Sequence, residues 1–227
     1  MFRELLSIFR SKDVLSEMGD DFTRMLQLAH EMILTAGAVF FGQKISPEDR
    51  DNLYQQDIRV NQSERSIRKQ VVAHLSVQGH RLDIPFCLLL MGLVKDVERM
   101  GDYAKNILEL ADFSPDQFPD DEAVKELQSI RHGVEDLFKT ALVILSSSES
   151  DQALSLIREG RKIAQRSDEL IESVARSDYD ASTTTALVLG TRYYKRVGGH
   201  LLNVVSSVVM PLHKVDYFDE DEIHSRV

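Results

Sequence analysis

The stretch that decides the fold is residues 88–112, LLLMGLVKDVERMGDYAKNILELAD. Its apolar residues recur at steps of three and four, which is the pattern of a helix with one buried face. These residues are Leu90, Leu93, Val94, Val97, Met100, Ala104, Ile107, Leu108 and Ala111. At about 100° per residue, Glu98 and Asp102 stand one turn apart on the edge of that face, with Glu109 further along it. The stretch therefore predicts a buried helix that carries a row of carboxylates.

Gly101 lies inside this apolar face, between the two carboxylates. A glycine within a helix costs about 1 kcal/mol relative to alanine. We therefore expect another backbone or side chain to approach this position closely.

Helical patterns also cover most of the remaining chain. They predict helices over about 13–41, 46–77, 120–145, 150–175 and 182–211, and the quoted helix opens at residues 83–85. The clearest break is residues 112–121, which contain Pro115 and Pro119. We therefore expect an all-α protein with a first bundle over residues 1–113, a second over 118–213 and a solvated acidic tail over 214–227. The first part includes a short amphipathic segment, residues 1–9, for which docking on the body is the simpler interpretation.

The second helix carries a carboxylate among its apolar residues. Glu64 points in the direction of Val60 and Ile67, and Asp57 and Asn61 border the same sector. A buried carboxylate has to be paired, hydrogen-bonded or bound to a metal ion. Ion pairing with Arg68 or Arg99 is one interpretation. The other is an oxygen-rich cluster of Asp57, Asn61, Glu64, Glu98 and Asp102 that encloses a cation.

Residues 96–107 also resemble the motif of the PhoU family, the regulators of phosphate uptake. The family pattern D-x-E-R-x-G-D-x-A-x-N-I is matched in register from Asp96 to Ile107. The resemblance implies two tandem, pseudo-symmetric bundles of three antiparallel helices. In that family the acidic motifs have been associated with iron or zinc clusters. It therefore implies iron, zinc or another divalent metal on the first bundle here, at Glu98, Asp102, Glu64, Asp57 and Asn61.

The chain contains an internal repeat that agrees with this resemblance only in part. A shift of 97 residues places Arg196, Gly198 and Asn203 on Arg99, Gly101 and Asn106. The carboxylates are not repeated, because Lys195 replaces Glu98 and Gly199 replaces Asp102. We therefore expect any metal on the first bundle alone.

Composition narrows the functions further. The formal net charge of −10 makes the chain a poor electrostatic partner for nucleic acid. Its single cysteine, Cys87, excludes an internal disulfide and fits the reducing cytoplasm, where we expect it to be a core residue. Residues 1–9 lack the pattern of a signal peptide, and no apolar run reaches 18 residues. Any membrane association would then be peripheral, through partners.

The motifs of common enzymes are missing from the sequence. It contains no G-x-S-x-G, H-E-x-x-H, phosphate-loop or G-x-G-x-x-G pattern, and no helix supplies the Glu-x-x-His pairs of a di-iron oxidase. The leading hypothesis is a non-enzymatic regulator of phosphate transport and phosphate-responsive signalling that acts by protein–protein contacts. The resemblance implies a phosphate-importer ATPase, a sensor histidine kinase or a phosphate cotransporter as partner, with a homodimer as a further option. The alternatives are a metal-binding helical-bundle enzyme or metal-storage protein, and a metal-free helical adaptor.

Overall fold

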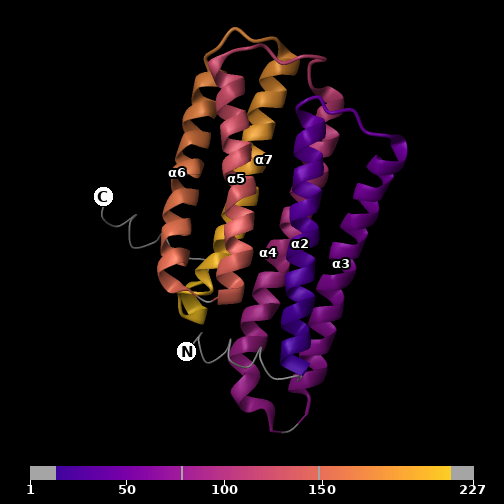
Figure 1. Ribbon diagram of the computed structural model, residues 1–227, viewed down its shortest axis with the longest axis vertical. Helices are drawn as coiled ribbons and strands as arrows, with labels where there is room; N and C mark the ends of the chain where they lie inside the picture. Colours follow the sequence, from indigo (N-terminus) through magenta and orange to yellow (C-terminus); the bar gives the residue numbers. More distant parts are fainter. Residues whose placement is uncertain (1–13, 78, 148, 216–227) are drawn as a thin grey trace.

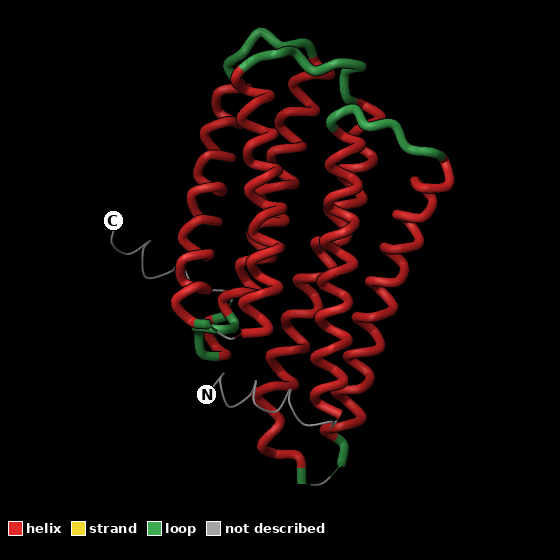
Figure 2. The backbone as a smooth tube through the Cα atoms, viewed as in Figure 1, coloured by secondary structure: helices red, strands yellow, loops and turns green. Residues whose placement is uncertain are grey.

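The computed structural model describes residues 14–77, 79–147 and 149–215, and in these ranges all regular structure is helical (Figure 2). The expected all-α fold is therefore confirmed. The amphipathic segment over residues 1–9 and nearly all of the acidic tail lie outside the described residues. No helix within the described ranges is both long and apolar enough to cross a bilayer.

The first three long helices pack on one another as an antiparallel bundle. They are α2 (Val14–Phe40), α3 (Pro47–Leu75) and α4 (Ile84–Leu110). Gly42 ends the turn after α2 with a φ of 96°, a conformation that favours glycine. Ser46 caps α3 by accepting a hydrogen bond from the Asp49 amide at 3.0 Å, and Pro47 fits the first turn, where no amide donor is needed.

The second three helices form a matching bundle. They are α5 (Glu122–Ser147), α6 (Ser150–Ala175) and α7 (Ala181–Ser206). Short 3₁₀ helices cover His80–Asp83 (η1), Ala111–Phe113 (η2) and Leu212–Lys214 (η3). Helix α5 begins two residues later than expected, because the Asp121 side chain caps it by accepting from the Val124 amide at 3.0 Å.

Helix α6 begins at Ser150 as expected, with Glu149 as the flanking residue. One further helix boundary differs from the sequence expectation. Helix α7 ends at Ser206, five residues before Pro211. Its last turn is closed by the Ser206 hydroxyl, which donates to the carbonyl of Val215 further along the chain. This return of the chain is a tertiary contact that a helical pattern cannot predict.

The two bundles lie side by side with α3 and α6 at the outer edges (Figure 1). Helices α4 and α7 form most of the contact between the bundles, and α2 and α5 add to it. Helix α4 begins at residue 84 and α7 at residue 181, which is the 97-residue shift of the internal repeat. The expected pseudo-symmetric pair of three-helix bundles is confirmed.

The expected close approach at Gly101 is wrong. A Cβ atom there would lie 3.4 Å from Val60 Cγ1 and 3.8 Å from Met32 Cε, which are ordinary contact distances. Close approach occurs at other glycines, including two where the bundles meet. A Cβ on Gly37 of α2 would lie 2.5 Å from the Tyr194 hydroxyl, and one on Gly190 of α7 would lie 2.8 Å from the Phe40 ring. These glycines let the two bundles approach closely.

Candidate functional site: the acidic face of the first bundle

The five residues expected to form a site lie along the seam between α3 and α4. Asp57, Asn61 and Glu64 follow one another at helical spacing on α3, and Glu98 and Asp102 do so on α4. The helices are held in this rotation by buried apolar neighbours, Val60 and Ile67 on α3 and Val97 and Met100 on α4. We call these five residues the acidic face.

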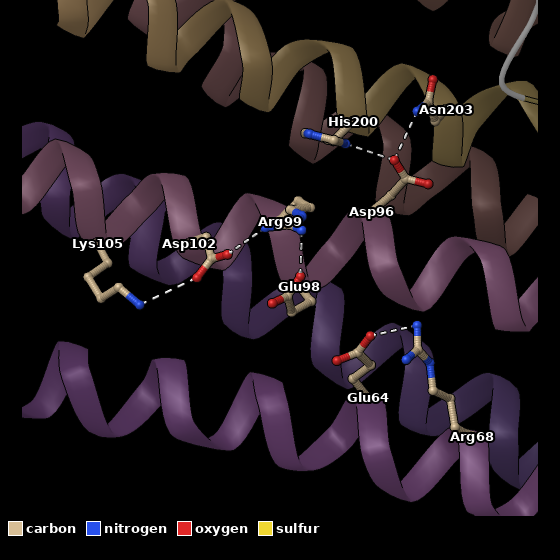
Figure 3. A network of polar contacts seen from close by, with 9 residues as sticks. All are labelled: Glu64, Arg68, Asp96, Glu98, Arg99, Asp102, Lys105, His200 and Asn203. Carbon is tan, nitrogen blue, oxygen red and sulfur yellow. Dashed lines mark hydrogen bonds and ion pairs between the residues drawn. The ribbon is translucent and has the colours of Figure 1, made fainter.

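Basic side chains contact every carboxylate of the acidic face. Figure 3 shows these contacts for Glu64, Glu98 and Asp102. Arg68 Nη2 lies 2.8 Å from Glu64 Oε1, so the ion pair with Arg68 expected for Glu64 is present. Arg99 lies 3.2 Å from Asp102 Oδ2 and 3.8 Å from Glu98 Oε2. Glu98 therefore has the longest of these contacts.

Lys105 joins the two helices of the acidic face. Its Nζ atom lies 3.2 Å from Asp57 Oδ2 on α3 and 3.4 Å from Asp102 Oδ1 on its own helix. Asp57 is 8% exposed, and the Asn61 amide also donates to it at 3.4 Å. Burial alone would lower the pKa of Lys105, but its hydrogen bond to Asp57 and the charges of both carboxylates raise that pKa overall. Lys105 therefore stays protonated between the helices.

Glu98 is the carboxylate with the least compensation. Burial raises its pKa, and the nearby charges of Asp102 and Glu64 raise it further, whereas the charges of Arg99 and Lys95 lower it in part. Three carboxylates thus influence one another at the centre of the acidic face. This makes Glu98 the residue most sensitive to an added cation or a basic partner.

The raised pKa of Glu98 leads to a prediction about stability. A carboxylate whose pKa is higher in the folded state favours folding at pH values below its unfolded pKa and loses that contribution as pH rises. We therefore expect Glu98→Gln to raise the melting temperature at pH 7 and to change it little at pH 4. Thermal unfolding followed by circular dichroism at both pH values measures this. A lower melting temperature at pH 7 would contradict the prediction.

As the side chains are arranged, the acidic face does not fit a metal ion. Among the described residues no three acidic, histidine or cysteine side chains converge closely enough to hold one. The positions beside the carboxylates are held by Arg68, Arg99 and Lys105. Metal on the first bundle stays a prediction of the family resemblance, and no step below depends on it.

Elemental analysis of the purified, untagged chain tests this directly. Because ion pairs already neutralise the carboxylates, we expect much less than one iron or zinc ion per chain, and the same content in a Glu98→Gln/Asp102→Asn variant. About one or more ions per chain that are lost in the double variant would contradict this expectation and support a metal site.

The corresponding seam of the second bundle has a different chemistry. Lys195, which replaces Glu98 in the repeat, donates to Asp168 Oδ2 on α6 at 2.6 Å. Gly199, which replaces Asp102, leaves open space where a side chain would be. The two bundles thus share helices and register, and only the first carries an acidic face.

Sequence reasoning missed one polar site, which lies between the bundles. Asp96 of α4 accepts hydrogen bonds at Oδ1 from His200 Nδ1 at 2.8 Å and from Asn203 Nδ2 at 2.9 Å, both on α7 (Figure 3). The Tyr103 ring packs against those of His200 and Tyr193, with centroids 5.8 and 5.9 Å away. The repeat gave one signal, because the 97-residue shift pairs Asp96 with Tyr193 and Tyr103 with His200. The Asp96–His200 contact and the Tyr193–Tyr103 contact therefore occupy equivalent positions in the two bundles.

The chain is thus an all-helical double bundle with an acidic seam between its second and third helices. A known domain family and solved structures are similar to it. The PhoU domain family matches residues 22–111, a range that includes the whole acidic face. The match covers most of α2 and all of α3 and α4.

Two solved structures share the fold over nearly their whole length. One is the phosphate transport system regulatory protein PhoU from Streptococcus pneumoniae, with 18% identity, a TM-score of 0.72, and coverage of 89% of this chain and 95% of that one. The other is PhoU from Pseudomonas aeruginosa, with 20% identity, a TM-score of 0.66, and coverage of 94% and 99%. No curated protein matches the sequence.

Proposed function

We propose that this chain is a non-enzymatic regulator of phosphate transport and phosphate-responsive signalling in the cytoplasm, and that it acts by binding other proteins. The observation that carries the proposal is the PhoU domain over residues 22–111 on a PhoU fold. A structural neighbour described as a phosphate transport system regulatory protein supports the same role.

The acidic face is the part of the first bundle best suited to contact a partner. Its ion pairs are partly exposed, with exposed fractions of 46% for the Arg99 side chain, 31% for Asp102 and 27% for Lys105. Ion pairs of this kind contribute little to stability, so exchanging them for contacts with a partner costs little. A partner with a basic segment would pair with Glu98 and Asp102. Its positive charge would offset the repulsion from Asp102, which adds to the effect of burial in raising the pKa of Glu98.

Three kinds of partner are consistent with this role: the ATPase of a phosphate importer, a sensor histidine kinase and a phosphate cotransporter. With any of these partners, the chain would adjust phosphate import to the phosphate supply. A homodimer is compatible with all three. The proposal does not involve nucleic acid, since the formal charge of the chain is −10.

Uptake of radiolabelled phosphate by cells with and without the chain tests the proposed function. Cells that lack the chain should keep importing phosphate at a high rate in phosphate-rich medium, whereas cells that contain it should reduce the rate. Equal uptake in the two strains under both rich and poor conditions would contradict the role in phosphate transport.

A further inference from the structure

The turn between α3 and α4 exposes a group of large apolar side chains. Leu82 of η1 is 88% exposed, and Ile84 and Leu88 of α4 are 41% and 51% exposed. Ile84 and Leu88 lie one turn apart on the same outward face of α4, whereas the outward residues further along that helix include Lys95 and Arg99. We call Leu82, Ile84 and Leu88 the apolar tip.

The apolar tip is well anchored. His74 of α3 contacts Asp83 Oδ2 at 2.8 Å, which fixes the end of α3 to η1. Gln70 Nε2 donates to Asp21 Oδ2 at 2.9 Å and so fixes the same part of α3 to the start of α2. The exposed leucines therefore lie on a part of the structure that side-chain contacts hold in place.

The start of α2 lies at the same end of the first bundle as the apolar tip (Figure 1). Helix α2 begins at Val14, which is itself 50% exposed, and thirteen residues precede it. Leu6 lies eight residues before Val14, so an extended chain would let it reach up to about 28 Å. The sequence that precedes α2 therefore joins the first bundle at the end that carries the apolar tip.

The sequence of that segment has the complementary chemistry. Phe2, Leu5, Leu6 and Phe9 are spaced so that a helix would present all four on one face, and Arg3, Glu4 and Ser7 fall elsewhere. A lipid surface is a weaker match, because few basic residues lie here and the whole chain is acidic. A short tether gives the segment an effective concentration in the millimolar range at its own bundle.

We propose that residues 2–9 dock through these four apolar side chains on the apolar tip of the same chain. The docked segment would cover Leu82 and Leu88 and cap the open end of the first bundle. This assigns an occupant to an apolar surface that lies away from the acidic face, and it is independent of the proposed function.

Thiol labelling of a Leu88→Cys variant of the full chain tests the docking. Cys87 does not interfere, since it is fully buried and burial, with the charge of Asp83, raises its pKa to about 11. Iodoacetamide should label the introduced thiol slowly, and about fivefold or more faster once Leu6→Asp and Phe9→Asp are added. Ser7→Asp, which adds a charge to the same segment outside its apolar face, should leave the rate unchanged.

A second position controls for general effects of the substitutions. Phe113 is 69% exposed beyond the opposite end of α4, about 37 Å from Leu88 at 1.5 Å per residue. Labelling of a Phe113→Cys variant should not respond to Leu6→Asp and Phe9→Asp. Three results would overturn the proposal: equal labelling of the Leu88→Cys variant with and without those changes, protection that increases with protein concentration and so indicates a second copy, or protection only with anionic phospholipid vesicles.

Discussion

Gly37→Ala is expected to lower the free energy of unfolding by about 2 kcal/mol. The added methyl group would lie 2.5 Å from the Tyr194 hydroxyl and 2.9 Å from Arg131 Nε. Tyr194 is fully buried, and Arg131 is held by a 2.7 Å hydrogen bond to Glu135. Neither group can move without disturbing the contact between the bundles, so the clash outweighs the gain in helix propensity.

Removal of the Tyr194 hydroxyl should relieve much of this cost. Among the described residues that buried hydroxyl has no hydrogen-bond partner, so Tyr194→Phe alone should be neutral or slightly stabilising. In the Gly37→Ala/Tyr194→Phe variant we expect about half of the lost stability to return. Gly198→Ala is the matched control, because its methyl group would lie 3.7 Å from Val134 Cγ2 and should stabilise the chain by up to about 1 kcal/mol.

Urea unfolding of these four variants gives the required free energies. If the effects of Gly37→Ala and Tyr194→Phe on the free energy of unfolding simply add, the Tyr194 hydroxyl is not the group that clashes with the added methyl group at residue 37.

Asp96→Ala is expected to destabilise the chain by about 2 to 3 kcal/mol, which lowers the melting temperature by roughly 6 to 9 °C for a chain of this size. The substitution removes both hydrogen bonds between Asp96 and α7 and leaves the side chains of His200 and Asn203 without this acceptor. The Asp96 and His200 side chains are only 13% and 23% exposed, so water replaces the lost contacts incompletely.

Two variants make this prediction specific. Asn203→Ala removes only one of the two bonds and should cost about half as much as Asp96→Ala. Asp168→Ala breaks the Lys195 pair on a carboxylate that is 61% exposed and should cost less than about 1 kcal/mol. Equal losses for Asp96→Ala and Asp168→Ala, measured by calorimetry, would mean that Asp96 does not hold the bundles together.

Much of the fold could be predicted from the sequence, because each helix has a strong apolar repeat and clear breaks. The quoted stretch predicted most of α4, and the 97-residue shift matches the starts of α4 and α7. Ser46 caps α3 and Gly42 ends the turn after α2. Both roles depend only on residues nearby in the sequence, so they were also predictable. Local chemistry was sufficient in these places.

Contacts between helices were harder to predict. The Glu64–Arg68 pair joins residues one helical turn apart and was one of the two interpretations of Glu64. The Lys105–Asp57 pair joins two helices and depends on their relative rotation. The same limit explains Gly101 and Gly37. A glycine pattern shows where a helix is weakened, but only the packed structure shows which glycine another helix approaches. Asp96 was likewise noted only as part of the family motif.

The acidic face also has features that the sequence predicts and features that depend on helix packing. Its five residues were predicted to share the α3–α4 seam, and the structure brings them there. Their state could be predicted only in part. Arg99 pairs with Asp102 within its own helix, whereas Lys105 reaches Asp57 only when α3 and α4 are correctly aligned. The ion-paired arrangement favours a role as a charged contact surface.

We propose that this chain acts on phosphate transport through the acidic face of its first bundle. The most direct test is phosphate uptake, in phosphate-rich medium, by cells that lack the chain and are complemented with matched variants. Wild type and Lys195→Gln/Arg196→Gln, which changes the equivalent seam of the second bundle, should restore low uptake. Glu98→Gln/Asp102→Asn, confirmed to be folded by its melting temperature, should leave uptake high. Full restoration by Glu98→Gln/Asp102→Asn would contradict the account.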